Sequence, residues 1–376
     1  MLINIYGTYL HLFEIPIIGF LLIGLFHDFN KGGLTFRIYQ TKYTQLFLIS
    51  MVLFTVSIFT SMLFANNPSL VFKDGIKWIE INIIIIGLFL YINTLRRMKM
   101  FYWLLFLSCF LFIIEIAIRY ILGILEIKSY RIFPGYEAAF ALALILPFIN
   151  RISKSQMILI LICIISALFS LSRGAWIATV LILINSIKLY DKSTKIILIA
   201  VLIFTLLLSF AVEPLKSYIF MKLSTILSSD DASNIERAQL LGLAWKAFLS
   251  SPLFGIGALN LYDFMLRHGF EGIIIEELEV ISVHNTFLQI AAEEGLFGLF
   301  AFILMILCNF ILLFKSPIHR KEQYFYIIGL RNFFIVMLVN FILGYIASQF
   351  RFFIALLMGL TLSLLNYGQS GHEAKN

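Results

Sequence analysis

Charged side chains are scarce in this 376-residue chain, in which 28 Lys and Arg and 21 Asp and Glu together make up 13%. An ordinary soluble domain carries roughly 25%. Apolar residues make up 61% of the chain, and 39 residues are phenylalanines. This composition excludes an ordinary soluble enzyme, a disordered protein and a collagen-like chain. It predicts an all-α membrane protein that crosses the bilayer several times.

The sequence also lacks the patterns of a disulfide framework or a metal site. Its three cysteines, Cys109, Cys163 and Cys308, lie inside apolar runs, as small buried side chains do. It contains neither a DxD cluster nor an HExxH motif, so we expect no metal and no other cofactor. The net charge of +7 does not indicate nucleic-acid binding, because basic residues of membrane proteins collect in cytoplasmic loops.

Apolar stretches of the length of membrane spans recur along the chain. A helical span needs about 20 mostly apolar residues, and the first stretch lacks the basic segment and cleavage site of a signal peptide, so we expect it to be retained. The Ser172-Arg173-Gly174 sequence divides one long apolar run, which predicts a turn at the membrane surface. The eleven stretches are 8–27, 45–65, 76–95, 101–125, 135–150, 156–172, 174–188, 195–212, 286–314, 325–346 and 352–367.

The basic residues predict the orientation of these spans. One alternate set of loops and the C-terminal tail hold fifteen Lys and Arg, whereas the short loops of the other set hold six. The set with more Lys and Arg is therefore cytoplasmic. This places the C-terminus inside the cell and, with eleven spans, the N-terminus outside. A twelfth span near the N-terminus would place the N-terminus inside instead. The predicted parts are a bundle at 1–212, a periplasmic loop at 213–283, helices at 284–367 and a tail at 368–376.

The periplasmic loop is long enough to be functional and has structure of its own. Ser233 and Glu236 form a capping-box pattern at the start of a helix, which we expect to end near Ser250, before Pro252. Gly255 and Gly257 then predict a tight turn.

Two arginines on this outer face are candidates for anion binding. At 100° per residue, the face of Arg237 also carries apolar side chains, and Lys246 lies opposite. A guanidinium in an apolar stripe is either paired with a carboxylate or able to bind phosphate. Arg173 lies at the same membrane face, where the alternative is an arginine that reaches from a helix end towards water. The apolar companions of Arg237 are Leu241, Trp245 and Phe248.

His284 is the candidate general base, with Asn285 beside it where the loop re-enters the membrane. On a continuous helix, small residues down to Gly295 and Gly298 would line the face below His284 and allow close packing. The alternative is a capping or interfacial histidine without chemistry. Together, the histidine would activate an acceptor hydroxyl, and the arginines would stabilise a lipid diphosphate leaving group. Further candidates for substrate contact are Tyr136, Glu137, Arg131 and Arg351.

Three motifs resemble the O-antigen ligase and polymerase superfamily. His284-Asn285, nine residues, Gly295, two residues and Gly298 match the whole of its signature. Ser172-Arg173-Gly174 resembles its Ser/Thr-Arg element, and Arg237 through Pro252 to Gly257 resembles its outer-loop element. The resemblance covers about residues 168–314.

This resemblance implies a GT-C-like membrane glycosyltransferase in the bacterial inner membrane, with its active site facing the periplasm. It implies an undecaprenyl diphosphate-linked glycan as donor and lipid A-core, another lipid-linked glycan or a protein as acceptor. Arg173 and Arg237 would bind the diphosphate, and His284 would activate the acceptor. The sequence after His284 resembles polymerases as much as ligases, so a polymerase of O-antigen, capsule or exopolysaccharide repeats remains an alternative.

A transporter of lipids or solutes is the alternative from another class. Charges inside spans can mark a translocation route. Against it, the sequence shows neither an inverted repeat nor paired broken helices in corresponding halves. The intramembrane charges in question are Glu14, Glu80, Glu115 and Arg119.

Overall fold

The computed structural model describes most of the chain, and helices dominate the described part. The apolar content of the sequence explains this, because in lipid a helix satisfies its backbone N–H and C=O groups internally. The described residues are 2–5, 8–11, 19, 24, 42–121, 135–151, 154–170, 172–192, 194–196, 199–200, 203, 232–268, 283–315, 321–344 and 348–373.

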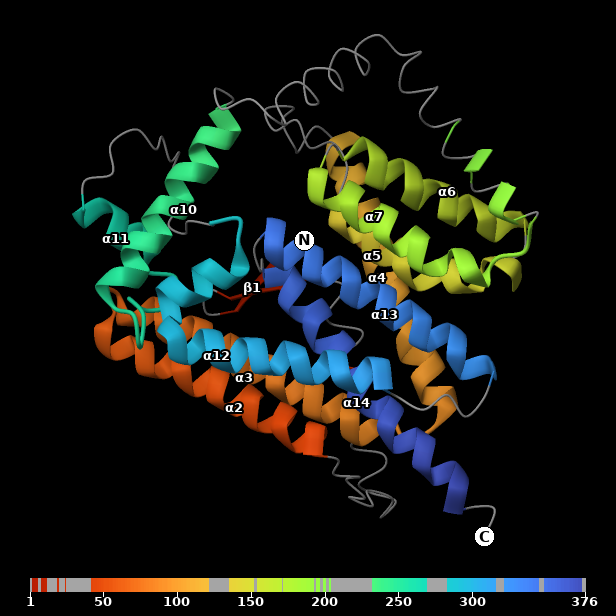
Figure 1. Cartoon of the computed structure of the whole chain (residues 1–376), viewed down its shortest axis with the longest axis horizontal. Coiled ribbons are helices and arrows are strands. Elements are labelled where there is room, and N and C mark those ends of the chain that lie inside the picture. Colours follow the sequence, from red (N-terminus) through yellow and green to blue (C-terminus); the bar gives the residue numbers. More distant parts are fainter. Residues whose placement is uncertain are drawn as a thin grey trace. The chain divides into compact units, whose positions relative to one another are not determined.

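The chain divides into two compact units, each assembled from separate segments. The first contains Met1–Phe101, Ile235–Pro317 and Phe341–Asn376, and the second contains Tyr102–Asn234 and Ile318–Asn340. The division into domains predicted from the sequence remains a prediction. Figure 1 labels the elements of both units.

The first unit is mainly helical in its described residues. A short antiparallel hairpin near its start pairs Leu2 with His11. Its elements are β1 (Leu2–Ile5), β2 (Thr8–His11), α2 (Lys42–Ser61), η1 (Met62–Phe64), α3 (Pro68–Tyr91), α10 (Ala232–Ser250), α11 (Leu261–Arg267), α12 (Thr286–Lys315) and α14 (Ser348–Glu373).

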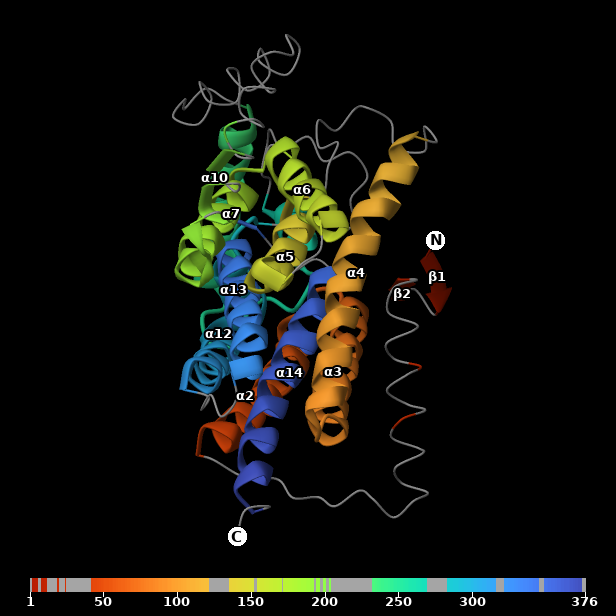
Figure 2. The same ribbon diagram turned by 90° about the vertical axis from the view of Figure 1, so that its right-hand side faces the viewer.

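Helix α2 packs along α12, and α3 packs along α14 (Figure 2). The buried face of α2 repeats every three to four residues, at Phe47, Met51, Phe54 and Ile58, as a helix buried on one side requires. The Phe54 ring contacts the ring of Phe302 in α12, with their centroids 5.3 Å apart. Because lipid is as apolar as these side chains, close packing rather than removal from water holds such helices together.

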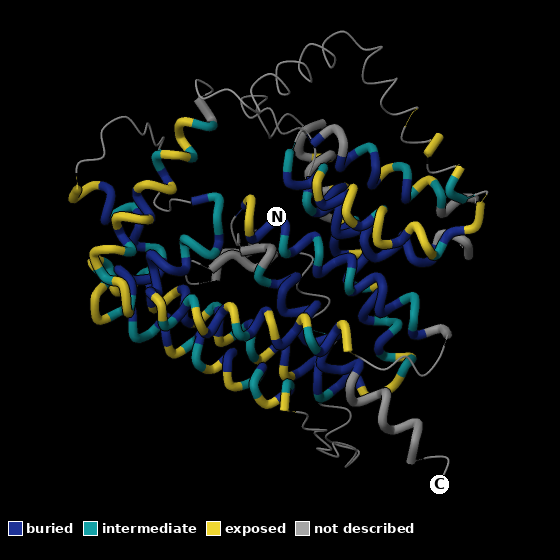
Figure 3. Tube along the Cα trace, viewed as in Figure 1, coloured by how far each residue is buried: buried dark blue, intermediate teal, exposed yellow. Residues whose placement is uncertain are grey.

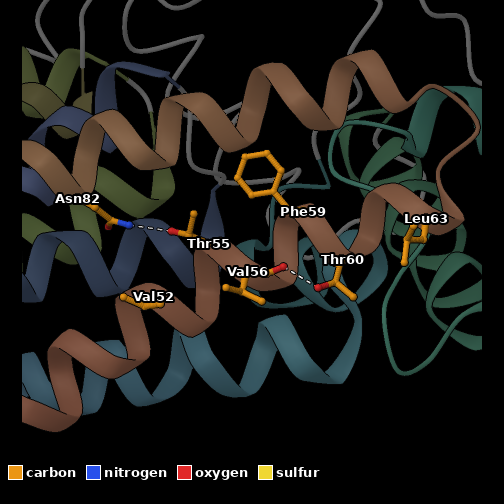
Figure 4. A pocket seen from close by; sticks show the side chains of 7 residues that line it. All are labelled: Val52, Thr55, Val56, Phe59, Thr60, Leu63 and Asn82. Atoms are coloured by element: carbon orange, nitrogen blue, oxygen red, sulfur yellow. Dashed lines mark hydrogen bonds between the residues drawn. The ribbon is translucent and has the colours of Figure 1, made fainter.

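The opposite face of α2 is exposed (Figure 3), and it is apolar too, with Val52 60% and Val56 46% exposed. This exposed face forms one wall of a shallow groove between α2 and α3, in which the Asn82 amide donates a hydrogen bond of 2.7 Å to the Thr55 hydroxyl (Figure 4). Apolar side chains on both faces are what a lipid-embedded helix requires.

The second unit groups α5 against both α6 and α7. Almost every residue of α5 is buried, including Ala138, Ala139, Ala141 and Ala143, whose small side chains allow close approach of neighbouring helices. Most residues of α4 and α13 belong to this unit, and the remainder of each, up to Phe101 and from Phe341, belongs to the first. Its elements are α4 (Leu95–Ile121), α5 (Gly135–Ile145), η2 (Leu146–Arg151), α6 (Lys154–Phe169), α7 (Arg173–Ser186), η3 (Ile187–Leu189) and α13 (Lys321–Leu343).

The expected all-α membrane helix bundle is confirmed. Within the described ranges, three helices are long and apolar enough to cross a membrane, at Lys42–Phe64, Thr286–Lys315 and Gln323–Leu343. β2 takes the first four residues of the span predicted at 8–27. The rest of that stretch and most of 195–212 lie outside the described residues, so the number of spans remains a prediction.

Candidate functional site

The start of α12 places His284 at the N-terminal end of a long apolar helix. Asn285 caps this helix, because its Oδ1 atom accepts a hydrogen bond of 2.9 Å from the backbone N–H of Leu288. A cap of this kind stabilises a helix end by about 1 kcal/mol. His284 is half-buried and has a φ of 55°, a left-handed conformation in which histidine is enriched among non-glycine residues.

The C-terminal end of α13 and the residue after it also hold the start of α12. The Asn285 amide donates to the carbonyl oxygen of Ile342 at 3.4 Å, and the Thr286 hydroxyl donates to that of Gly344 at 3.5 Å. Both the oxygen and the nitrogen of the Asn285 side-chain amide therefore make structural hydrogen bonds. Its predicted contact with substrate remains a prediction.

Helix α12 is broken at Gly295, which has φ of 72° and ψ of −167°. In a regular helix, the N–H groups of Leu296 and Phe297 would donate to carbonyls four residues earlier. Here they donate to the carbonyls of Pro252 and Leu253 in the preceding loop, at 2.8 and 3.2 Å. A side chain at position 295 would strike the Leu253 carbonyl, so only glycine fits.

The same loop takes up the carbonyls that the break releases. The oxygens of Ala292 and Glu293 accept from the N–H groups of Ile256 and Gly257, at 3.0 and 2.9 Å. Gly255 has a φ of 73°, and a side chain there would strike the Glu293 carbonyl. The break removes two backbone hydrogen bonds within α12, and four hydrogen bonds to the loop replace them. None of these backbone groups is therefore left unpaired.

This exchange corrects the projection of residues 284–298 as one continuous helix. The turn predicted at Gly255 and Gly257 is present, with positive φ at both residues. Gly295, however, does not serve close packing of an unbroken helix. It opens α12 so that the loop can hydrogen-bond to it.

Helix α10 ends at Ser250, as predicted, and buries one face. The prediction that Arg237 shares an inward stripe with Leu241 and Trp245 is wrong, because these two side chains are 38% and 52% exposed. Arg237 itself is half-buried at the edge of the buried face, and Lys246 is exposed as predicted. The face that packs inward has small residues at its centre, which allow close approach: Leu240, Leu243, Ala244 and Ala247.

One apolar cluster joins α10 to α11 and to the start of α12. Val283, next to His284 in sequence, is fully buried in this cluster together with Leu243 of α10 and Leu261 of α11. The helix that carries Arg237 and the residue before His284 therefore belong to one packed group. Buried side chains of this cluster therefore hold the helix of Arg237 and the residue before His284 together.

Asn260 anchors this group to the connection between α2 and α3. Its Oδ1 atom accepts a hydrogen bond of 2.6 Å from the backbone N–H of Asn67, and its amide donates to the Asn67 carbonyl at 3.2 Å. Asn260 is fully buried. Nearby, the rings of Phe64 and Phe254 stack with centroids 5.5 Å apart.

Arg351, a predicted substrate contact, forms an ion pair with Asp74 of α3. Its guanidinium also lies over the Trp78 ring, 5.5 Å from the centroid. Sequence reasoning missed Asp74, because the apolar stretch was taken to begin at residue 76. The structure begins the helix at Pro68, so Asp74 and Trp78 share a face one turn apart.

In the second unit, Arg173 is the first residue of α7, at the predicted break. The Ser172 hydroxyl accepts from the backbone N–H of Ala175, which caps the helix. The Arg173 guanidinium donates a hydrogen bond of 3.2 Å to the side chain of Asn234, the third residue of α10.

Tyr136 and Glu137 are at the start of α5. A side chain at position 174 would strike the Tyr136 hydroxyl, so the Tyr136 ring occupies the space that Gly174 leaves beside Arg173. Glu137 is buried, with 7% of its surface exposed. The structure thus brings Tyr136 against the Arg173 turn, and the predicted contacts of Tyr136 and Glu137 with substrate remain predictions. Arg131 lies outside the described residues.

The predicted site residues divide between the two units. Arg237, His284, Asn285 and Arg351 belong to the first, and Arg173, Tyr136 and Glu137 belong to the second. Within the described ranges, no three His, Cys, Asp or Glu side chains are arranged to hold a metal ion. The expectation of a reaction without metal or cofactor remains a prediction.

Comparison with known proteins identifies the central part of the chain. No curated protein matches its sequence. Residues 158–303 match the sequence model of a family described as O-antigen ligase, which confirms the resemblance to that superfamily. The matched segment includes Arg173, Arg237 and His284, so all three lie in the part of the chain that is similar to O-antigen ligases.

Proposed function

We propose that the protein transfers a glycan from undecaprenyl diphosphate to an acceptor such as lipid A-core, at the periplasmic face of the inner membrane. The observation that carries this proposal is the match of residues 158–303 to the O-antigen ligase family, which includes all three residues with proposed chemical roles. The apolar helices that flank the domain support a substrate held by a lipid anchor.

The proposed reaction is a substitution at the anomeric carbon of the donor glycan. The acceptor hydroxyl oxygen forms the new glycosidic bond, the bond from that carbon to the diphosphate breaks, and His284 takes the hydroxyl proton. Arg173 and Arg237 bind the diphosphate and stabilise its growing charge, because guanidinium groups pair bidentately with phosphate oxygens. The diphosphate bond supplies the free energy, so no nucleotide is needed.

Local structure supports the roles of His284 and Arg173. His284 lies at the N-terminus of α12, where the helix dipole favours negative charge nearby, and its backbone is fixed by the Asn285 cap and by buried Val283. Arg173 lies at the N-terminus of α7, which is likewise suited to anions.

The transporter alternative loses one of its supporting residues. Glu80 pairs with Lys77, with a nitrogen–oxygen distance of 3.2 Å, and is therefore not an isolated intramembrane charge. Glu14 and the side chains of Glu115 and Arg119 lie outside the described residues.

The test is a lipopolysaccharide gel from a strain that lacks this gene, complemented by variants of the full chain. Free core with accumulated undecaprenyl-linked polymer supports a ligase, whereas core capped by single repeats indicates a polymerase. We expect H284A and R237A to insert into the membrane normally and to abolish transfer. The matched control is K246A, which changes an exposed residue of the same helix as Arg237. Full activity of H284A or R237A would overturn the proposed site.

A further inference from the structure

A small polar cavity runs along α12 in the first unit. Five of its lining residues follow the period of one helix face, from the first turn of α12 to the residue before its break. The cavity has a volume of about 40 Å³, and α2, α3 and α14 close its other sides. The α12 residues are Thr286, Gln289, Ile290, Glu293 and Glu294.

The cavity holds three carboxylates and one guanidinium, and two buried polar atoms remain unpaired. Asp74 is paired with Arg351, and Glu293 accepts a hydrogen bond of 3.3 Å from the Gln289 amide. Glu294 is only 4% exposed, and its Oε2 atom has no hydrogen-bond partner in the described part of the chain. The Nε atom of Arg351 is buried without a partner there as well.

Two glycines next to Glu294 in α12 set the position of its side chain. Gly298, one turn later, has no side chain, and an added Cβ atom there would lie 2.3 Å from the Cβ of Glu294. The break at Gly295 follows Glu294 directly. The two glycines thus open the helix and leave space for this buried carboxylate.

The two unpaired atoms define the chemistry of an occupant. A carboxylate oxygen accepts and a guanidinium N–H donates, so a single group that meets both atoms must donate one hydrogen bond and accept another. A cation would satisfy Glu294 but not Arg351, and an anion the reverse. A hydroxyl group donates one hydrogen bond and accepts another. The space is large enough for a hydroxyl or hydroxymethyl group, because a cavity of about 10–15 Å³ already holds one water molecule.

We propose that this cavity is a hydroxyl-binding subsite for the acceptor glycan. A hydroxyl of the glycan donates to Oε2 of Glu294 and accepts from the Nε–H of Arg351. This rests on the proposed function, in which His284 acts on the acceptor. Because the cavity begins at Thr286, two residues after His284, a group bound along α12 belongs to the acceptor rather than to the lipid diphosphate.

The test measures steady-state transfer by the full chain in proteoliposomes, with the lipid-linked donor and the acceptor varied separately. We expect E294L to raise the acceptor KM about tenfold and to leave kcat and the donor KM within twofold. E294Q keeps one accepting oxygen and should rescue most of the acceptor KM. The control is E80Q, at a carboxylate outside the cavity that pairs with Lys77.

A direct binding measurement separates this subsite from the catalytic proposal. Binding of the acceptor glycan to the H284A protein should weaken about tenfold when E294L is added, in the absence of turnover. If E294L leaves acceptor binding or the acceptor KM unchanged and lowers only the melting temperature, the cavity holds only structural water. That result would overturn the subsite. Transfer by H284A would instead overturn the proposed function.

Discussion

The backbone N–H of Gly257 donates a 2.9 Å hydrogen bond to the carbonyl oxygen of Glu293, which a regular helix would use within itself. This bond belongs to a four-bond exchange between α12 and the loop that follows α10. The exchange fixes the register of the two segments, because a shift by one residue would leave buried backbone groups unpaired. It therefore ties the helix of Arg237 to the helix that starts after His284.

The first prediction concerns Gly295. Its backbone region is almost restricted to glycine, and a side chain there costs of order 1–3 kcal/mol before the collision with Leu253 is counted. We expect G295A to lower the melting temperature of the protein in detergent by several degrees and to abolish transfer. Fluorescence-detected unfolding and the gel assay measure the two effects.

Gly242 provides the control for this substitution. It lies in α10, and an added Cβ atom would meet nothing within 4 Å. G242A should be neutral or stabilise the protein by up to about 1 kcal/mol, because alanine favours a helix more than glycine does. If G295A were as stable and active as G242A, the backbone exchange would not be needed to hold the loop in place.

The second prediction compares two asparagines that meet at one contact. N260A removes two hydrogen bonds from the Asn260 side chain to the backbone of Asn67 and should cost about 2 kcal/mol. N67A keeps that backbone and loses only an exposed hydrogen bond of 2.7 Å from the Ser69 hydroxyl, so it should cost about 0.5 kcal/mol. Denaturant unfolding of the purified variants gives both values, and equal costs would contradict the anchoring role of Asn260.

The third prediction concerns the pair of Asp74 and Arg351. D74N removes the carboxylate that pairs with the Arg351 guanidinium in a largely buried site. Breaking such a pair typically costs about 3–5 kcal/mol, and the Glu293 and Glu294 carboxylates in the same cavity should reduce this cost. The double variant D74L/R351M removes both charges and should be less destabilised than D74N. A double-mutant cycle on thermal unfolding measures the coupling. Additive effects of the single variants would mean that the pair is not formed in the membrane.

The helix ends were largely predictable from local chemistry. Ser172 caps α7 at the predicted turn, and α10 stops at Ser250 ahead of Pro252. These features depend on a few neighbouring residues, because side-chain caps and proline act within one turn. The signature around His284 also located the start of α12.

The contacts between distant segments were not predictable in the same way. A hydrophobic pattern gives the period of a helix but not which partner each face meets, so the exposed Trp245 was placed inward. Asp74 and Arg351 are 277 residues apart, and nothing local to either residue indicates the other. From the sequence alone, Gly295 fits a small-residue packing face as well as it fits a helix break. The contacts of the loop at residues 252–257 decide between the two.

The fourth prediction tests the packing of Tyr136 against the Arg173 turn. An alanine side chain at position 174 would lie 1.7 Å from the Tyr136 hydroxyl, so G174A forces the ring or α7 to move. We expect G174A to destabilise the protein by about 1–3 kcal/mol, as overpacking does, and to reduce transfer through displaced Arg173. Adding Y136A should relieve the collision, so that the double variant is less destabilised than the sum of the single variants by about 1–2 kcal/mol. Strict additivity in thermal unfolding would show that the Tyr136 ring does not occupy the space beside Gly174.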